Sequence, residues 1–272
     1  MLFLKRLFNF YIKSSFHLGI CLICLYVVSI NKLEININYV LIIFLFCSTF
    51  FTYNFIKYGK KILKKLSNQN LTLKLIKYLS FFCLLILINT LFYLNLDTIL
   101  FSVFLFILCL LYAYPFAGLK SNFRNFSKVK LFFVAICWSG SVVVLPILEI
   151  GNSFSLHHIL FFLQIFILVI IYTIPFEVRD LKNDSFDLQT IPQILGVQNS
   201  KIFCYTLIIL FIFISYIISN SFNDFFADLV LSVILTIIIT ITKEEQSKYF
   251  SSFWVEALPI YWLVIYYLMN KI

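Results

Sequence analysis

Long apolar runs alternate with short polar connections along almost the whole chain. With a window of about 20 residues for one membrane span, nine apolar runs can be counted. They cover residues 14–30, 37–57, 76–95, 97–116, 131–149, 157–177, 201–219, 225–242 and 253–270. The pattern predicts an all-α, multi-pass membrane protein with nine transmembrane helices, in a single domain that covers residues 1–272.

The composition supports this class. The chain is 62% hydrophobic and 12% charged, whereas about a quarter of the residues in soluble domains are charged. The first residues, MLFLKRLFNFYIKSSF, are basic but carry no small-residue cleavage site. They are interpreted as an interfacial lead-in to the first span and not as a cleaved signal. We expect an integral protein of a bacterial inner membrane.

Basic residues gather in alternate connections. All but two of the 21 Lys and Arg residues lie at the N-terminus or after the second, fourth, sixth and eighth runs, the exceptions being Lys32 and Lys271. Since basic connections stay in the cytoplasm, the N-terminus is predicted to be cytoplasmic and the C-terminus to lie outside. The net charge of +9 therefore reflects topology and not nucleic-acid binding. Function is expected on the cytoplasmic face.

An acidic cluster follows the sixth run. Asp180, Asp184 and Asp187 are three of only 12 acidic residues, and they stand beside Arg179 and Lys182. Acidic residues near a membrane are costly and indicate function. On a helix, Asp180 and Asp184 share one face and can hold one divalent cation. The alternative is a solvated, ion-paired cytoplasmic loop.

Helix-end signals frame this cluster. Pro175 can kink or end the preceding helix. Thr190, Pro192 and Gly196 are typical of a cap, an early helical proline and a C-terminal glycine around one short helix. The segment is therefore predicted to be an ordered turn and short helix between two spans.

Two other cytoplasmic connections carry residues suited to a phosphate group. Lys120 and Arg124 follow the fourth run, and Asn54, Lys57 and Lys61 stand at the end of the second. Lys and Arg both bind phosphate, and Arg does so through two parallel hydrogen bonds. The alternatives are topology signalling with lipid headgroup contact for the first group and an anionic-lipid patch for the second. Glu256, near the cytoplasmic start of the ninth run, is a lesser candidate that faces the interior.

The residues after the sixth run resemble a known pattern. The stretch RDLKND at 179–184, then TIP at 190–192 and LG at 195–196, is similar to the second aspartate-rich motif of the UbiA-type intramembrane prenyltransferases. In that family D-x-x-x-D is followed by T-[LI]-P-x-x-[LI]-G. The motif covers about 20 residues, while the nine-helix layout resembles the family over nearly the whole chain.

The resemblance implies a nine-helix bundle around a central cavity, and an enzyme that transfers alkyl groups. Such enzymes move an isoprenyl group from a prenyl diphosphate to a lipophilic, often aromatic, acceptor. The resemblance assigns Asp180 and Asp184 as catalytic ligands of Mg²⁺. It assigns Arg179, Lys120 and Arg124 to the diphosphate. Mg²⁺ would neutralise the charge of the departing diphosphate.

The first family motif, N-x-x-x-D-x-x-x-D, is degenerate in this chain. Asn54 matches its Asn, but Tyr58 and Ile62 stand at the two Asp positions. No carboxylate occurs between Glu34 and Asp97 that a shift of register could use instead. We therefore predict that Asn54, Lys57 and Lys61 contact the diphosphate, and that the charge of Lys57, Lys60 or Lys61 replaces that of one metal ion.

Two other functions stay open. The first is a non-catalytic protein that binds an isoprenoid lipid or a partner enzyme, in which case Asp180→Ala leaves its function intact. A small transporter would need polar residues at mid-membrane in several spans, and only scattered ones occur, such as Asn89, Ser139 and Gln164. These are also explained as helix–helix hydrogen bonds.

Overall fold

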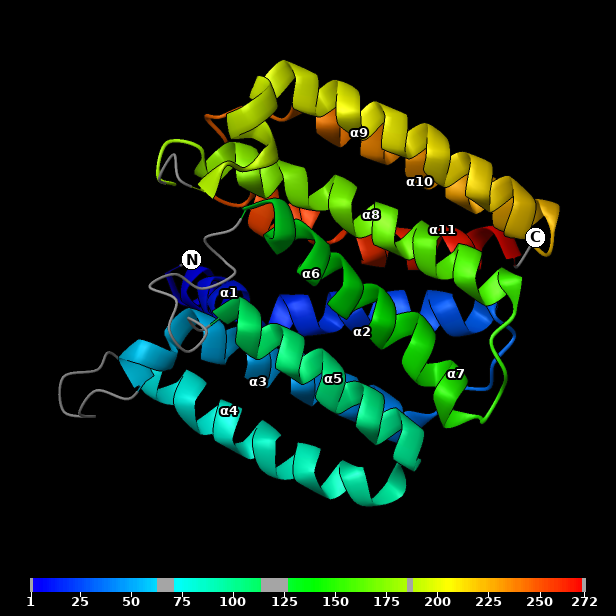
Figure 1. The fold of residues 1–272 in the computed structure, drawn as a ribbon. Helices are drawn as coiled ribbons and strands as arrows, with labels where there is room; N and C mark the ends of the chain where they lie inside the picture. The colour runs from blue at the N-terminus through cyan, green and yellow to red at the C-terminus, as the bar shows by residue number, and fades with distance from the viewer. Residues whose placement is uncertain (1, 63–70, 114–126, 185–187, 271–272) are drawn as a thin grey trace.

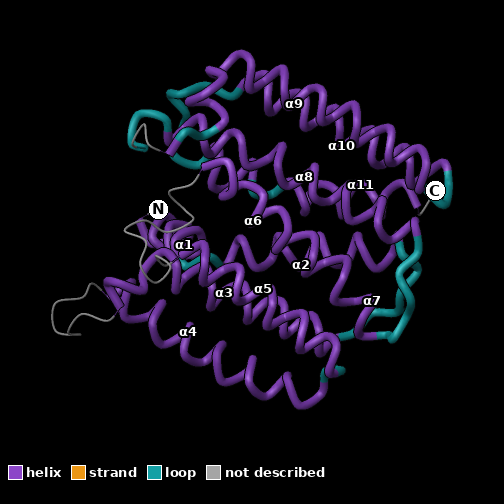
Figure 2. The backbone as a smooth tube through the Cα atoms, in the orientation of Figure 1, coloured by secondary structure: helices purple, strands orange, loops and turns teal. Residues whose placement is uncertain are grey.

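The computed structural model describes residues 2–62, 71–113, 127–184 and 188–270. Helices form nearly all of this part, and no strand occurs in it (Figure 2). The helices are α1 Leu2–Lys13, α2 Phe16–Lys32, α3 Tyr39–Ile62, α4 Leu71–Thr90, α5 Leu96–Ala113, α6 Ser127–Ser139, α7 Leu145–Glu149, α8 Leu156–Asp180, α9 Ile191–Ile218, α10 Phe222–Ile241 and α11 Leu258–Asn270. A 3₁₀ turn, η2 Leu91–Tyr93, and two π-helical turns, η4 Gly140–Val144 and η6 Phe250–Val255, adjoin them.

The helices lie side by side, as Figure 1 shows, with the two chain ends at opposite ends of the bundle. The connections α8–α9 and α10–α11 lie at the end that carries the N-terminus. The connections α2–α3, α7–α8 and α9–α10 lie at the end that carries the C-terminus. We call these the N-terminal and C-terminal ends of the bundle; the first is the end predicted to face the cytoplasm.

The all-α, multi-pass prediction is confirmed, and each of the nine apolar runs overlaps a helical segment. Within the described residues, seven helices are long and apolar enough to cross a membrane, and the bent pair α1–α2 would be an eighth span. The apolar part of α5, Leu96–Tyr112, is shorter. The total of nine spans and the side of the N-terminus stay predictions.

α8 runs through the middle of the bundle and α4 along its edge. The apolar window of α8 is 61% buried and that of α4 only 17%. The outer face of α4 carries large apolar side chains such as Phe81, Phe82 and Leu85, each at least half exposed. A soluble protein would not leave such a surface in water, so this face is suited to lipid.

Close approach of two central helices depends on Gly19. A Cβ atom at this position would lie 2.8 Å from the ring of Phe46 on α3. Gly19 on α2 therefore lets this pair of helices pack with an aromatic side chain between them, as small residues commonly do in membrane bundles.

The helix-end signals after the sixth run act as predicted, with one refinement. Thr190 is the N-cap of α9, and its backbone N–H donates to Oε1 of Gln193 at 2.9 Å. Gly196 has φ 76° and interrupts the helix, so a short first segment precedes the long span. Pro175 does not end α8, which continues to Asp180. The carbonyl of Pro175 also accepts a hydrogen bond from Nε2 of Gln246 at 3.0 Å.

A buried ion pair lies toward the C-terminal end of the bundle. Lys32 donates to Oδ2 of Asp228, which also accepts from Nε2 of Gln164 and Oγ of Ser215. Oδ1 accepts from Nε1 of Trp262 at 2.9 Å. Asp228 is completely buried and Lys32 is 5% exposed. One carboxylate therefore joins α2, α8, α9, α10 and α11.

Candidate functional site

A cavity of about 490 Å³ opens toward the N-terminal end of the bundle. Helices α1, α2, α3, α5, α6 and α8 contribute to its wall, together with the segment around η6. Leu18, Leu131, Val134 and Tyr172 make part of the wall apolar. The cavity is thus a polar entrance with an apolar interior, built from segments at both ends of the sequence.

Charged side chains line the cavity in both signs. The basic ones in the described lining are Lys13, Lys57, Arg179 and Lys248, and the acidic ones are Glu177, Asp180 and Glu256. So many charges beside apolar spans are costly unless they serve a ligand or one another. The excess of basic groups suits an anion.

Arg179 and Asp180 form a forked ion pair at the cavity wall. Nε and Nη2 of Arg179 donate to the two carboxylate oxygens of Asp180 at 2.8 and 2.9 Å. The guanidinium also lies over the ring of Phe176, 5.2 Å from its centroid. Both side chains keep about a third of their surface exposed. A ligand entering the cavity can therefore reach the pair.

Asp184 lies one turn beyond Asp180. Its backbone N–H donates to the carbonyl of Asp180 at 2.9 Å, which continues the helical path past the end of α8. Asp184 is not among the described side chains that line the cavity. The structure thus brings Asp180 together with Arg179 and Lys57, and places Asp184 next to that group without adding it to the wall.

Asn54 is buried and holds the bend between α1 and α2. The two helices meet at 62°, with Ser15 at φ 62° in the left-handed region. Nδ2 of Asn54 donates to the carbonyl of Ser14 at 2.8 Å, and Oγ of Ser15 donates to Oδ1 of Asn54 at 3.3 Å. In this structure Asn54 contacts the chain and does not line the cavity.

We expect Asn54→Ala to destabilise the protein by about 1–3 kcal/mol, because the buried carbonyl of Ser14 loses its donor. Thermal unfolding in detergent measures this. Asn199→Ala is the matched control, since that exposed amide donates to its own helix at Leu195 and should cost at most about 0.5 kcal/mol. A loss of ligand affinity without a loss of stability would instead indicate direct contact with the diphosphate.

Lys57 is the lysine that the structure places at the cavity. It lies one turn after Asn54, and its Nζ donates to Oγ of Ser15 at 3.1 Å. Tyr58, at the first degenerate position, lines the cavity and donates to the carbonyl of Lys13 at 2.9 Å. The side chains of Lys60 and Lys61 lie outside the described residues, as do Lys120 and Arg124. Their predicted roles are therefore untested.

Glu256 faces the cavity just after the π-helical turn η6. Its carboxylate is close enough to Lys57 and Arg179 to interact with both charges. From the sequence it is only a lesser candidate, although a lone acid at the start of an apolar run is a usable signal. Lys13 and Lys248 also line the cavity, whereas their sequence positions indicate only topology. Nothing in the sequence indicated the cavity-facing side of the apolar spans.

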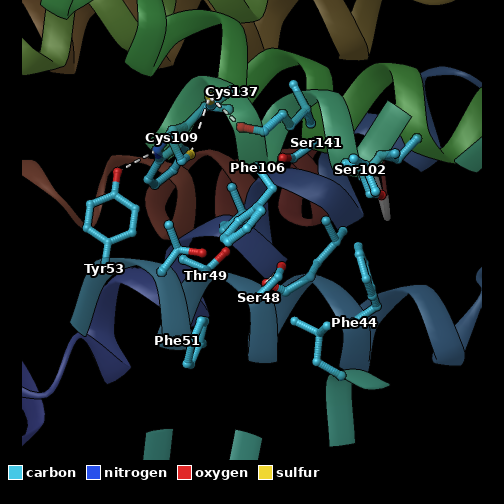
Figure 3. Close-up of a pocket in the computed structure, with 18 of the residues that line it drawn as sticks. Phe44, Ser48, Thr49, Phe51, Tyr53, Ser102, Phe106, Cys109, Cys137 and Ser141 are labelled. Carbon is cyan, nitrogen blue, oxygen red and sulfur yellow. Dashed lines mark hydrogen bonds between the residues drawn. The ribbon is translucent and has the colours of Figure 1, made fainter. Parts of the chain in front are cut away.

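A second, almost entirely apolar pocket of about 300 Å³ lies beside the first. Figure 3 shows side chains that line it, with Phe44 and Tyr53 toward opposite ends. Both residues are on α3, nine residues apart, which corresponds to roughly 13 Å along the helix. Tyr53 and Trp138 line both pockets. Their side chains form a shared wall.

Few side chains near the cavity are suited to bind Mg²⁺. Within the described ranges, no three His, Cys, Asp or Glu side chains are grouped to hold a metal ion. Mg²⁺ commonly binds one or two carboxylates together with substrate phosphates. The fork of Arg179 uses two of about four lone-pair sites on Asp180. Asp180 therefore keeps lone pairs that a ligand can use, and Tyr58 and Ile62, at the degenerate positions, carry no carboxylate.

Solved structures show a close likeness in fold. Structures of a UbiA homologue from Archaeoglobus fulgidus, bound to DMAPP and Mg²⁺ in one case and to GPP and Mg²⁺ in another, align with TM-scores of 0.66. Each alignment covers 97% of this chain and 99% of the other, at 14% and 13% identity. No protein-family model and no curated protein sequence matches the chain. The likeness establishes a UbiA-type fold.

Proposed function

We propose that this chain is a membrane-embedded prenyltransferase that binds a prenyl diphosphate in the 490 Å³ cavity and transfers its isoprenyl group to a lipophilic acceptor. One observation carries the proposal. In a UbiA-type fold, Lys57, Arg179 and Asp180 meet at the polar part of a cavity whose interior is apolar. This arrangement matches a ligand with a charged head and a hydrocarbon tail.

Different residues bind the two parts of the ligand. Lys57 and Arg179 attract the diphosphate, and Glu256 balances their charge while the cavity is empty of ligand. The apolar interior holds the isoprenyl chain away from water. The aromatic ring of Tyr172, which lines the cavity, can stabilise positive charge on the allylic carbon as the diphosphate leaves.

Asp180 and Asp184 would hold one Mg²⁺ ion, which when bound supplies positive charge to the departing diphosphate. The forked pair with Arg179 orients the Asp180 carboxylate for this role. Lys57 lines the same cavity from α3, the helix that has lost the first motif, and supplies a fixed positive charge there. We thus assign the site one metal ion and one lysine.

Binding of geranyl diphosphate to the detergent-purified protein, with Mg²⁺ or with a chelator, tests the proposal. Mg²⁺ should strengthen binding at least about tenfold, and the Asp180→Ala/Asp184→Ala variant should lose that gain. Glu244→Ala/Glu245→Ala is the matched control, because it removes two exposed carboxylates outside the cavity. No binding by folded protein at any chain length would contradict the proposal.

One observation favours a second function. Both oxygens of Asp180 are already bonded to Arg179, and the first motif has no carboxylates. A non-catalytic protein that binds an isoprenoid lipid would show these features. It would bind the ligand equally well with and without Mg²⁺, and Asp180→Ala would not change its affinity.

A further inference from the structure

We propose that the hydrogen-bonded pair Tyr53–Trp138 limits the length of the isoprenoid chain that the cavity accepts. The proposal rests on the proposed function, since it concerns the tail of the same diphosphate ligand. Nε1 of Trp138 donates to the hydroxyl of Tyr53 at 2.9 Å. The two side chains line the charged cavity on one side and the apolar pocket on the other.

The pair is held firmly in place. Trp138 is 5% exposed, and its indole packs edge-on against the ring of Tyr172, with centroids 5.7 Å apart. Tyr53 and Trp138 come from α3 and α6, so their hydrogen bond joins two helices where the two pockets adjoin. In Figure 3 the hydroxyl of Tyr53 is drawn at one end of the apolar pocket with this bond dashed. The closed pair therefore separates two spaces of about 490 and 300 Å³.

The position of the bound diphosphate determines how far its isoprenoid chain can extend before it reaches the Tyr53–Trp138 pair. Lys57 lies one turn after Tyr53 on the same helix and lines the charged cavity only. A diphosphate bound at Lys57 and Arg179 leaves its tail directed into the apolar interior, where Trp138 forms part of the wall. A short chain ends there. A longer chain must displace the indole to continue into the apolar pocket.

The apolar pocket is shaped to receive such an extension. It runs along roughly 13 Å of α3 between Phe44 and Tyr53. Its few polar lining groups are hydroxyls and thiols, such as Ser48, Ser102 and Cys109. The hydroxyl of Ser102 is already bonded to the carbonyl of Thr98 at 2.7 Å. Each methylene buried there gains free energy of transfer from water, so opening the pair favours longer chains.

The test compares ten-carbon and twenty-carbon prenyl diphosphates, bound to purified wild type and to Trp138→Ala. Wild type should bind the ten-carbon chain more tightly. Trp138→Ala should strengthen binding of the twenty-carbon chain at least about tenfold with little change for the ten-carbon chain. Equal affinities of wild type for both chains, or no gain in the variant, would overturn the inference.

Two further variants make the result specific. Ser141→Leu fills the apolar pocket, so it should leave wild-type binding of the ten-carbon chain unchanged and cancel the gain in the Trp138→Ala background. Trp138→Phe keeps most of the bulk but removes the donor, so it should give a smaller gain in affinity for the twenty-carbon chain. It replaces Trp138→Ala in the test if that variant does not fold. Loss of ten-carbon binding in Ser141→Leu alone would show that the tail already occupies the pocket, and would overturn the inference. Absence of binding by wild type at every length would instead overturn the proposed function along with it.

Discussion

Replacing Asp228 by Ala is expected to cost about 3–5 kcal/mol of folding free energy, the largest loss we predict for a single substitution. The carboxylate accepts hydrogen bonds from Lys32, Gln164, Ser215 and Trp262. Removing it leaves the ammonium group of Lys32 buried and without its counter-charge. Burying an unpaired charge costs far more than the net contribution of a well-made pair.

Thermal unfolding in detergent checks this prediction, with Asp97→Ala as the matched control. Asp97 stands exposed in the first turn of α5, where loss of a helix-terminal charge costs about 0.3–1 kcal/mol. A double variant, Lys32→Met/Asp228→Leu, removes both charges and should recover part of the lost stability, because no charge is then buried alone. Recovery is incomplete because Gln164, Ser215 and Trp262 still lack their acceptor. If Asp228→Ala unfolds at the same temperature as Asp97→Ala, the ion pair does not hold the five helices together.

Replacing Lys57 by Gln is expected to weaken diphosphate binding by about 10- to 100-fold, with or without Mg²⁺. Hydrogen bonds to charged groups contribute about 1.5–3 kcal/mol, and each 1.4 kcal/mol is a factor of ten in affinity. Lys57 lines the cavity next to Ser15 and stands on the helix whose acidic motif is missing. Under the proposed function, its charge would replace part of what a second metal ion supplies.

Equilibrium binding of geranyl diphosphate measures the effect. Lys57→Arg retains the charge and should keep most of the affinity, whereas Lys201→Gln removes a lysine outside the cavity, bonded to the carbonyl of Thr240, and should bind like wild type. Equal losses in Lys57→Gln and Lys201→Gln would show a general charge effect. Unchanged affinity in Lys57→Gln would remove this lysine from the site.

Periodicity and apolar run length predicted the helices well, because a membrane span must bury about 20 apolar residues and satisfy its backbone internally. The cap and turn residues likewise predicted the start of α9 at Thr190 and its interruption at Gly196. The partner of the Asn54 side chain could not be predicted, because a polar residue at a helix end can bind a ligand or a neighbouring backbone group equally well. The bend at Ser15 shows that it binds the backbone, at the carbonyl of Ser14.

The residues that line the cavity could not be predicted from the sequence for a different reason. In a soluble helix the polar face shows which side is buried. In α3 and α6, apolar residues face lipid, core and cavity alike, so Tyr53 and Trp138 carry no distinguishing pattern. Lys32 and Asp228 were visible as lone charges in or beside apolar runs, but they are 196 residues apart, and only the packed helices make them a pair.

The wall of the cavity is completed where helices α1 and α2 meet the segment around η6. Nε2 of His17 bonds to the carbonyl of Phe253, and the hydroxyl of Tyr249 donates to Asn9, 240 residues earlier. At about 5–20 residues per second, a ribosome needs roughly 10–50 s to make that interval. The helices that are made first are therefore in the membrane before the last part of the cavity wall has been synthesised. The ability to bind ligand should appear abruptly, when the last segment is inserted.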